Sequence, residues 1–188
     1  VPLVTELVPL EETYAVQRAT KEEVWAQVKT DLTEAAAGLP ETDGDGRATK
    51  YSALGILADV HLNLGEHSAA KTAIDQVIGS GNYEFFDDFA DVYKDSNNNG
   101  KHSIFSIQFL NQTGEGNSYP TRHAPKFIDA STWKYAGSGR NLVPSVDLWN
   151  AFEPGDVRRD LSLRNEWVDG QDGSVNTDSY YQIKHGVS

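Results

Sequence analysis

Two helical patterns separated by a very short break constrain the fold more than any other feature of this chain of 188 residues. The first pattern runs over about 49–64 and the second over about 68–78, with Gly65 and Glu66 interrupting them. A break this short makes the two helices run antiparallel, as a helical hairpin. The inward positions expected from the helical spacing are Leu54, Leu57, Ala58, His61 and Leu64 on the first helix, and Ala70, Ile74, Val77 and Ile78 on the second.

The hairpin resembles a tetratricopeptide repeat in its small residues and its spacing. His61 and His67 stand at repeat positions that are normally aromatic, which favours a packing role for both. Because one such hairpin cannot bury its own faces, we expect a helix over 20–38 to cover one side and chain outside this sequence to cover the other. Thr20 and Glu23 form a capping-box pattern at the start of that helix. Its expected apolar stripe consists of Val24, Val28, Leu32, Ala35 and Leu39.

The second half of the chain has little helical period and many turn residues. The pattern predicts a strand over 104–109, a helix over 142–152, and two strands that pair, over 163–168 and 180–184. Residues 111–142 are rich in Asn, Gly, Ser, Thr and Tyr, and a loop of this length is uncommon unless it is functional or disordered.

The predicted fold class is therefore mainly α, with a tetratricopeptide-like helical hairpin scaffold, long irregular loops and a few short strands. Residues 1–95 are predicted to form the helical repeat scaffold. Residues 96–188 are predicted to form a loop-rich region with short strands and helices, packed on the scaffold as part of one larger domain.

The acidic composition excludes nucleic acid as a partner. The chain has 16 Lys and Arg against 28 Asp and Glu, a formal net charge of −12, and no basic run. Nucleic-acid binding needs clustered basic side chains that displace counterions from phosphates, and a polybasic contact with anionic lipid needs the same. No apolar run approaches the roughly 18 residues of a transmembrane helix. An acidic surface fits a secreted or cell-surface protein that handles neutral ligands.

Cysteine and methionine are both absent from the sequence. Without cysteine there can be no disulfide, no thiol nucleophile and no cysteine-bound metal. No segment has the three regions of a signal peptide. Because Val1 is not a natural start, we expect the chain to be an internal piece of a longer protein.

Metal-binding patterns are weak. Asp95-x-Asn97-x-Asn99-Gly100 matches the start of a calcium loop, whose oxygen ligands normally close with a glutamate. The closing position here falls at Ser106, so an Asx-rich turn is the favoured interpretation. The five histidines are scattered without zinc-ligand spacing. We predict no metal and no cofactor.

Patterns for catalysis are also weak. Glu153, Asp156 and Asp160 could supply the two opposed carboxylates of a glycoside hydrolase. Arg158 and Arg159 stand among them, which favours helix-cap and salt-bridge roles for the two aspartates. No nucleophile elbow and no Gly-rich phosphate loop is present. We predict no catalytic residue and therefore no enzyme.

Six segments together resemble the middle of SusD/RagB-family proteins, in the family's order. They are residues 1–6, 22–32, 47–50, 77–83, 104–109 and 152–160. The resemblance implies a tetratricopeptide-like scaffold that carries irregular loops and captures glycans or similar nutrients without altering them. It also implies a SusC-like TonB-dependent transporter as partner. Outer-membrane attachment at the cell surface would go through an N-terminal lipidated cysteine outside this chain.

Aromatic and polar side chains of the 111–142 loop are the predicted ligand contacts. Sugars are held by flat aromatic faces and by polar side chains on loops that a rigid scaffold positions. The candidates are Trp133, Tyr135, Tyr119, Arg122 and Asn141. The alternative is that Trp133 and Tyr135 pin the loop to the scaffold. For the other tryptophans, Trp25, Trp149 and Trp167, packing is favoured.

Three function hypotheses follow, from different classes. The first is a nutrient-binding protein that captures oligosaccharide at the bacterial outer-membrane surface and delivers it to the transporter. The second is a helical-repeat interaction module whose groove beside His61 and His67 takes a peptide. The third is a glycoside hydrolase fragment. Exposed rings in the loop would favour the first, a groove at the histidines the second, and opposed carboxylates in a cleft the third.

Overall fold

The computed structural model describes residues 1–109, 116, 143–177 and 181–182. By its internal contacts the chain divides into two compact units. The first comprises 1–85 and 101–107, and the second comprises 86–100 and 108–188. The predicted division into a scaffold over 1–95 and a loop-rich region over 96–188 stays a prediction.

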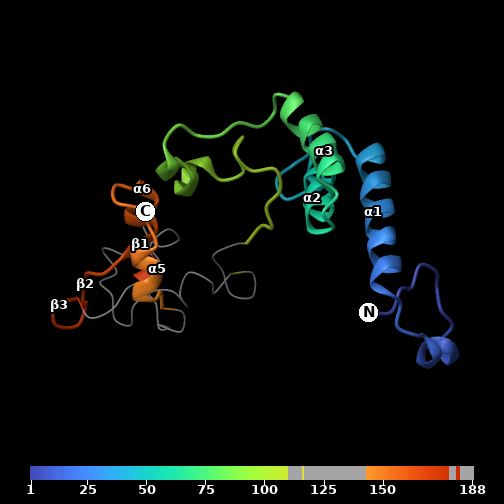
Figure 1. The fold of residues 1–188 in the computed structure, drawn as a ribbon, viewed down its shortest axis with the longest axis horizontal. Coiled ribbons are helices and arrows are strands. Elements are labelled where there is room, and N and C mark those ends of the chain that lie inside the picture. The colour runs from blue at the N-terminus through green and yellow to red at the C-terminus, as the bar shows by residue number, and fades with distance from the viewer. Residues whose placement is uncertain (110–115, 117–142, 178–180, 183–188) are drawn as a thin grey trace. The chain divides into compact units, whose positions relative to one another are not determined.

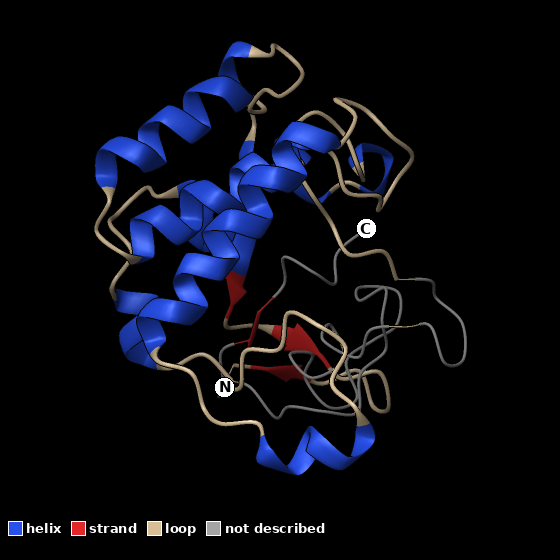
Figure 2. Ribbon diagram, turned by 90° about the vertical axis from the view of Figure 1, so that its right-hand side faces the viewer, coloured by secondary structure: helices blue, strands red, loops and turns tan. Residues whose placement is uncertain are grey.

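Three helices build the first unit (Figures 1 and 2). They are α1 (Lys21–Gly38), α2 (Lys50–Asn63) and α3 (His67–Gly79), preceded by the short 3-10 helix η1 (Leu10–Ala15). Helices α2 and α3 pack against each other, and α1 packs against α2. The predicted hairpin and its covering helix are therefore confirmed. Among the described residues, no helix combines the length and apolar character that a membrane span requires.

Local capping explains where α1 and α2 begin. The Glu23 backbone N–H donates to Thr20 Oγ1 (3.2 Å), and the Thr20 N–H donates to Glu23 Oε2 (2.8 Å), which confirms the predicted capping box. Thr49 and Ser52 repeat this reciprocal arrangement at the start of α2. Each box satisfies backbone donors that a helix start leaves without an intrahelical acceptor.

Gly65 allows the chain to reverse between α2 and α3. Its φ of 75° lies in the left-handed region, which a residue without Cβ adopts at little cost. The turn is closed by two backbone hydrogen bonds, from Gly65 N–H to Leu62 O (3.0 Å) and from Glu66 N–H to His61 O (2.8 Å).

The core of the first unit lies between α2 and α3. Its buried members are Tyr51, Leu54, Ala58, Ala73 and Val77, and the half-buried Ala36, Ile74, Tyr83 and Ile104 pack against them. The prediction for Ile78 is wrong, because its side chain is 66% exposed and Ala73 faces inward instead. Ala70, Ala73 and Val77 follow a spacing of three and four residues, and this narrower stripe leaves Ile78 at its edge.

The predicted strand over 104–109 is wrong. The described residues of this segment form no strand. Ile104 packs on the hairpin core, while Phe105, Ile107 and Phe109 are exposed. The alternation of apolar residues therefore reflects one anchoring contact on a helical surface and no pairing with a neighbouring strand.

Gly55 makes room for that contact. A Cβ atom added to Gly55 would lie 3.3 Å from Ile104 Cγ2, closer than ordinary van der Waals contact. We expect Gly55→Val to lower the free energy of unfolding by about 1–3 kcal/mol, as overpacking does. The matched control is Gly38→Val, because a Cβ at Gly38 meets nothing within 4 Å. Urea denaturation of both variants would test this, and an equal effect at the two glycines would contradict the contact.

The second unit consists of short elements. They are the 3-10 helices η2 (Phe89–Tyr93) and η3 (Asp95–Asn97), the helices α5 (Val146–Asn150) and α6 (Val157–Ser162), and the strands β1 (Leu163–Arg164), β2 (Trp167–Val168), β3 (Val175–Asn176) and β4 (Tyr181–Gln182). Strand β1 pairs antiparallel with β4, placing Leu163 opposite Gln182. Strand β2 pairs antiparallel with β3, placing Trp167 opposite Asn176.

These strands refine the sequence prediction. The single strand expected over 163–168 is two strands with different partners, and the pairing expected with 180–184 belongs to β1 alone. The turn after β2 closes by the Asp169 N–H donating to Ser174 O at 2.9 Å, which forms a local hairpin. The helix predicted over 142–152 is shorter, because only Val146–Asn150 is helical among its described residues.

Candidate functional site

The five predicted ligand contacts, Trp133, Tyr135, Tyr119, Arg122 and Asn141, all lie outside the described residues. Their assignment as ligand contacts therefore stays a prediction. Other side chains of the second unit form a candidate site.

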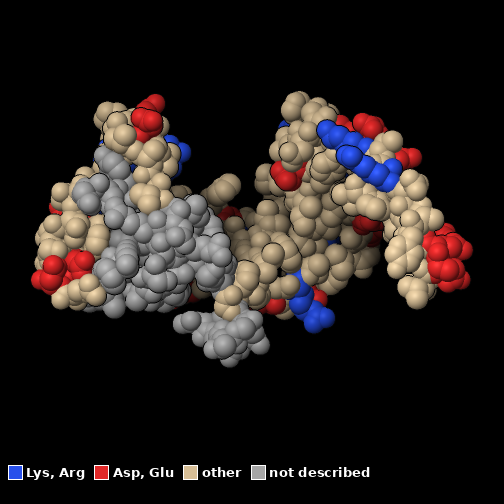
Figure 3. All heavy atoms as spheres, turned by 90° about the horizontal axis from the view of Figure 1, so that it is seen from below, with Lys and Arg blue, Asp and Glu red and all other residues tan. Residues whose placement is uncertain are grey.

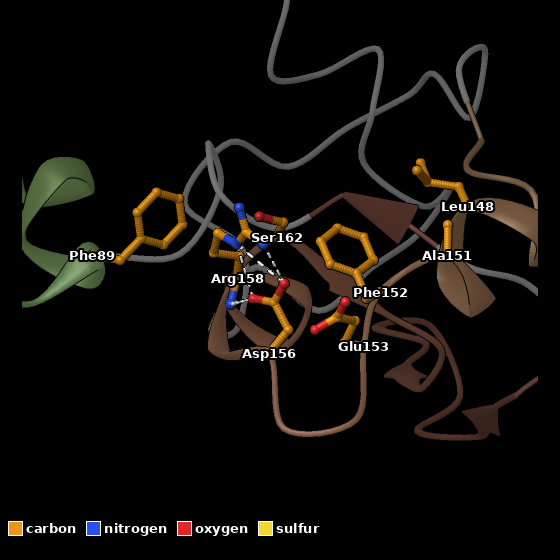
Figure 4. Close-up of a pocket in the computed structure, with 8 residues that line it drawn as sticks. All are labelled: Phe89, Leu148, Ala151, Phe152, Glu153, Asp156, Arg158 and Ser162. Atoms are coloured by element: carbon orange, nitrogen blue, oxygen red, sulfur yellow. Dashed lines mark hydrogen bonds and ion pairs between the residues drawn. The ribbon is translucent and has the colours of Figure 1, made fainter.

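A hollow of about 500 Å³ lies in the second unit (Figure 4). Ligand sites commonly enclose about 300–1,000 Å³, so the hollow is large enough for a small ligand. Eight side chains line it: Phe89, Leu148, Ala151, Phe152, Glu153, Asp156, Arg158 and Ser162. Phe89 comes from η2, and the others come from α5, α6 and the connection between them.

Asp156 fixes the polar side of the hollow. It caps α6 by accepting the Arg158 backbone N–H on Oδ1 at 2.9 Å. The same carboxylate accepts Arg158 Nε at 2.9 and 3.1 Å and Arg158 Nη2 at 2.5 Å. The Asp156 side chain is only 12% exposed. Hydrogen bonds from the Arg158 side chain, followed by the one from its backbone, hold the pKa of Asp156 below its ordinary value.

These contacts confirm the predicted cap and salt-bridge roles. Asp160 accepts from Arg159 Nε at 2.8 Å, so both aspartates are paired with arginine. Since both Asp156 oxygens are engaged by Arg158, Asp156 is poorly placed to exchange protons with a substrate. The arrangement therefore positions a guanidinium group and does not resemble an acid–base pair.

Aromatic rings form the apolar side of the hollow. Phe89 and Phe152 are both half-buried, and Figure 4 shows Arg158 and Ser162 between them. Phe89 packs edge-on against Tyr93, with ring centroids 5.4 Å apart and an interplanar angle of 80°. This contact restrains the Phe89 ring without covering it, which leaves part of its surface for a ligand.

The described tryptophans pack as predicted. Trp25 and Trp149 are half-buried, and Trp167 is buried. The Arg159 guanidinium lies over the Trp149 ring, 4.8 Å from its centroid. Within the described part of the chain, none of the three is an exposed ring available for stacking.

The proposed calcium loop is an Asx-rich turn. Asp95–Asn97 forms η3, and Asn97 Nδ2 donates to Asp91 O at 2.8 Å. Asn99 exchanges two side-chain hydrogen bonds with Gln108, at 3.0 and 2.9 Å. The favoured interpretation of this segment is therefore confirmed. Among the described residues, no group of three or more His, Asp or Glu side chains converges as metal ligands would.

Comparison with known proteins places these features in a family context. No family model matches the sequence. The SusD-like protein P25 of Formosa agariphila is 24% identical over 206 residues, which cover 89% of this chain and 39% of that relative. A solved structure described as a laminarin-binding SusD-like protein superposes with a TM-score of 0.82 at 24% identity, covering 98% of this chain and 46% of that one. This chain is similar to SusD-like proteins over most of its length.

A second solved structure supports the same fold. Surface glycan-binding protein A from Bacteroides thetaiotaomicron, in complex with laminarihexaose, matches with a TM-score of 0.72 at 17% identity. The match covers 89% of this chain and 42% of that one, so this chain spans less than half the length of these relatives. The predicted fold class, mainly α with a tetratricopeptide-like scaffold, is confirmed.

The chain has a polar cluster where the peptide groove was predicted. His61 is half-buried, with Nδ1 2.5 Å from Glu66 Oε2, and Lys29 Nζ donates to Glu66 Oε1 at 2.8 Å. Hydrogen bonds from Lys29 first and His61 second lower the pKa of Glu66. The cluster joins α1 to the turn between α2 and α3. The packing role predicted for His67 is wrong, because this residue is exposed at the start of α3.

A hollow in the first unit lies away from the two histidines. It is lined by Leu3, Val4, Thr5, Glu6, Val8, Glu12, Ala15 and Val16, all within the loop that precedes α1. The loop is closed at its base by the Ala19 N–H donating to Val1 O at 3.2 Å. Neither His61 nor His67 contributes to this hollow.

The charged surface is mixed on the face drawn in Figure 3. Acidic side chains gather at its right-hand edge, over the segment before α1, and Lys and Arg side chains lie next to acidic ones. Among the described residues, ion pairs join Lys29 to Glu66, Lys50 to Glu41, Lys71 to Asp75, Lys94 to Asp91 and Lys101 to Glu84. A polyanion would have to compete with these carboxylates for the five lysines.

Sequence reasoning missed the hollow. It assigned Asp156 and Arg158 structural roles, and it placed neither Phe89 nor Phe152 at a ligand site. The available signal was the pair of carboxylates, Glu153 and Asp156, that follows the aromatic Phe152 closely in sequence. Whether this segment lies near Phe89 of η2 depends on the tertiary structure.

Proposed function

We propose that this chain belongs to a nutrient-binding protein of the bacterial cell surface that captures oligosaccharides. In this role it holds ligand without altering it and delivers it to a SusC-like TonB-dependent transporter in the outer membrane. Attachment to that membrane is through a lipid anchor outside this chain. The observation that carries the proposal is the superposition on a laminarin-binding SusD-like protein over 98% of the chain.

The architecture supports capture rather than chemistry. A stiff helical hairpin with a buried core accompanies a loop-rich second unit, and rigid scaffolds that position loops are suited to ligand binding. In the hollow, apolar rings lie beside a guanidinium group that is fixed by Asp156. We propose that Trp133, Tyr135, Tyr119, Arg122 and Asn141 of the 111–142 loop contribute further contacts with the ligand.

Calorimetric titration with neutral polysaccharides, laminarin first among them, tests the proposal. We expect saturable binding, and we expect Trp133→Ala and Tyr135→Ala each to weaken it roughly tenfold through loss of a stacking face. Glu22→Gln, an exposed change without an aromatic ring on α1, is the control and should leave affinity unchanged. A folded protein that binds no polysaccharide would overturn the proposed function.

A further inference from the structure

The hollow of the second unit contains polar groups that are not engaged within the described chain. The Glu153 carboxylate and the Ser162 hydroxyl line it, and neither has a side-chain hydrogen bond among the described residues. Arg158 uses Nε and Nη2 to hold Asp156, which leaves the donors of Nη1 for another acceptor. One wall of the hollow therefore offers both donors and acceptors.

The apolar surface of the hollow comes from two phenylalanine rings. Phe89 and Phe152 present apolar surface from different elements, and Leu148 and Ala151 extend it along α5. A pyranose ring has a complementary division, with C–H groups on its faces and hydroxyl groups at its edge. A flat apolar wall together with a few fixed polar groups is the common composition of small-molecule sites.

The charge of the hollow restricts which sugars fit. Asp156 neutralises the nearby Arg158, so Glu153 leaves the lining with a net negative charge. A carboxylate or sulfate on a sugar would meet this charge at short range and would find no unpaired cation among the lining residues. A hydroxyl group meets no such penalty, and it can donate a charge-assisted hydrogen bond to Glu153 or accept one from Arg158.

We propose that the hollow formed by Phe89, Phe152, Glu153, Arg158 and Ser162 is a subsite for one uncharged sugar ring, and that it discriminates against uronic and sulfated sugars. The proposal rests on the proposed function and names the ligand class and residues of one subsite. Phe89 and Phe152 supply apolar contacts with the C–H groups of the sugar, while Glu153, Arg158 and Ser162 meet its hydroxyl groups.

Two ligands of equal length test it by calorimetry: laminarihexaose, which is neutral, and a hexameric oligogalacturonide, which carries a carboxylate on every ring. We expect the protein to prefer laminarihexaose. Phe89→Leu and Phe152→Leu should each weaken its binding roughly tenfold, since leucine keeps apolar volume but lacks a flat face. Glu153→Gln should reduce the preference for the neutral ligand roughly tenfold by removing the repulsive charge. Glu22→Gln, an exposed change on α1, is the control.

The outcomes separate the two proposals. Binding of laminarihexaose that all three hollow variants leave unchanged would overturn the subsite while the proposed function stands. A wild-type preference for the oligogalacturonide, or a Glu153→Gln variant with unaltered preference, would overturn the selectivity. If the wild-type protein binds neither this ligand nor any other glycan, the proposed function fails and the subsite fails with it. Because Glu153 is exposed, Glu153→Gln should leave the fold intact. It therefore tests the subsite even if Phe89→Leu or Phe152→Leu disturbs η2 or α5.

Discussion

Replacing Leu54 by alanine is expected to lower the free energy of unfolding of the helical unit by about 2–5 kcal/mol. Leu54 is 5% exposed on α2 and belongs to the core cluster with Tyr51, Ala58, Ala73 and Val77. The substitution removes buried apolar atoms and leaves a cavity that neighbouring α3 can fill only in part. Because small domains are stabilised by roughly 5–15 kcal/mol in total, the loss is a large part of that margin. Urea denaturation followed by the far-ultraviolet circular dichroism of the helices measures it.

The same helix offers a matched control. Leu62 also lies on α2, but its side chain is 54% exposed. Leu62→Ala makes the identical chemical change with the identical change in helix propensity, and we expect it to alter the free energy of unfolding by about 0.5 kcal/mol or less. Comparable losses for the two variants would mean that α2 does not present Leu54 to α3, and the orientation of the hairpin would be wrong.

The hairpin could be predicted from sequence because its determinants are local. Capping residues, a helical spacing of apolar residues and Gly65 at the reversal all lie within the segment that folds. The spacing alone did not decide the limits of the buried stripe. It included Ile78, which lies at the edge, and omitted Ala73, whose small side chain gives a weak apolar signal but allows close approach of α2.

The strand predictions were less accurate because strand pairing depends on a distant partner. Apolar alternation over 104–109 looked like a strand, but no partner pairs with these described residues, and Ile104 packs on helices. In 163–168 the residue types were right, but pairing with two different partners divides the segment into β1 and β2. A pattern of period two reports which side chains are apolar and not what they pair with.

The candidate site shows the same difference between features set by neighbouring residues and features set by distant ones. The roles of Asp156 and Arg158 follow from neighbouring residues at a helix start, so sequence was sufficient to predict them. The hollow needs Phe89 from a segment that precedes it by many residues, and no local pattern indicates that meeting. Aromatic rings in the 111–142 loop drew the prediction there because composition identifies sugar-binding residue types but not their positions in space.

Acidification is expected to destabilise both units, with most of the loss below about pH 4. Carboxyl groups with pKa values below their ordinary 4.5 for Glu and 3.8 for Asp are Glu23, Glu41, Glu66, Asp156 and Asp172. A group whose folded-state pKa is lowered contributes stability that is present above its unfolded-state pKa and is lost as the pH falls through the folded value. Each group in this chain therefore stabilises the fold at neutral pH and stops doing so when protonated. Urea midpoints measured from pH 7 down to pH 3 should fall steeply only at the acidic end.

Glu66 allows the acid effect to be traced to named contacts. Its carboxylate joins Lys29 on α1 and His61 on α2, so Glu66→Gln should lower stability at pH 7 and reduce the loss between pH 7 and pH 3. Glu22→Gln changes an exposed residue of α1 and is the matched control. It should leave the stability at pH 7 and the loss on acidification unchanged, because Glu22 has no side-chain partner among the described residues. Added salt at 1 M, where screening acts over about 3 Å, should weaken these ion pairs but spare the Thr20–Glu23 capping box. If Glu66→Gln unfolds with the pH dependence of the unaltered chain, the Lys29–Glu66–His61 contacts do not link α1 to the hairpin in solution, and other carboxyl groups carry the acid transition.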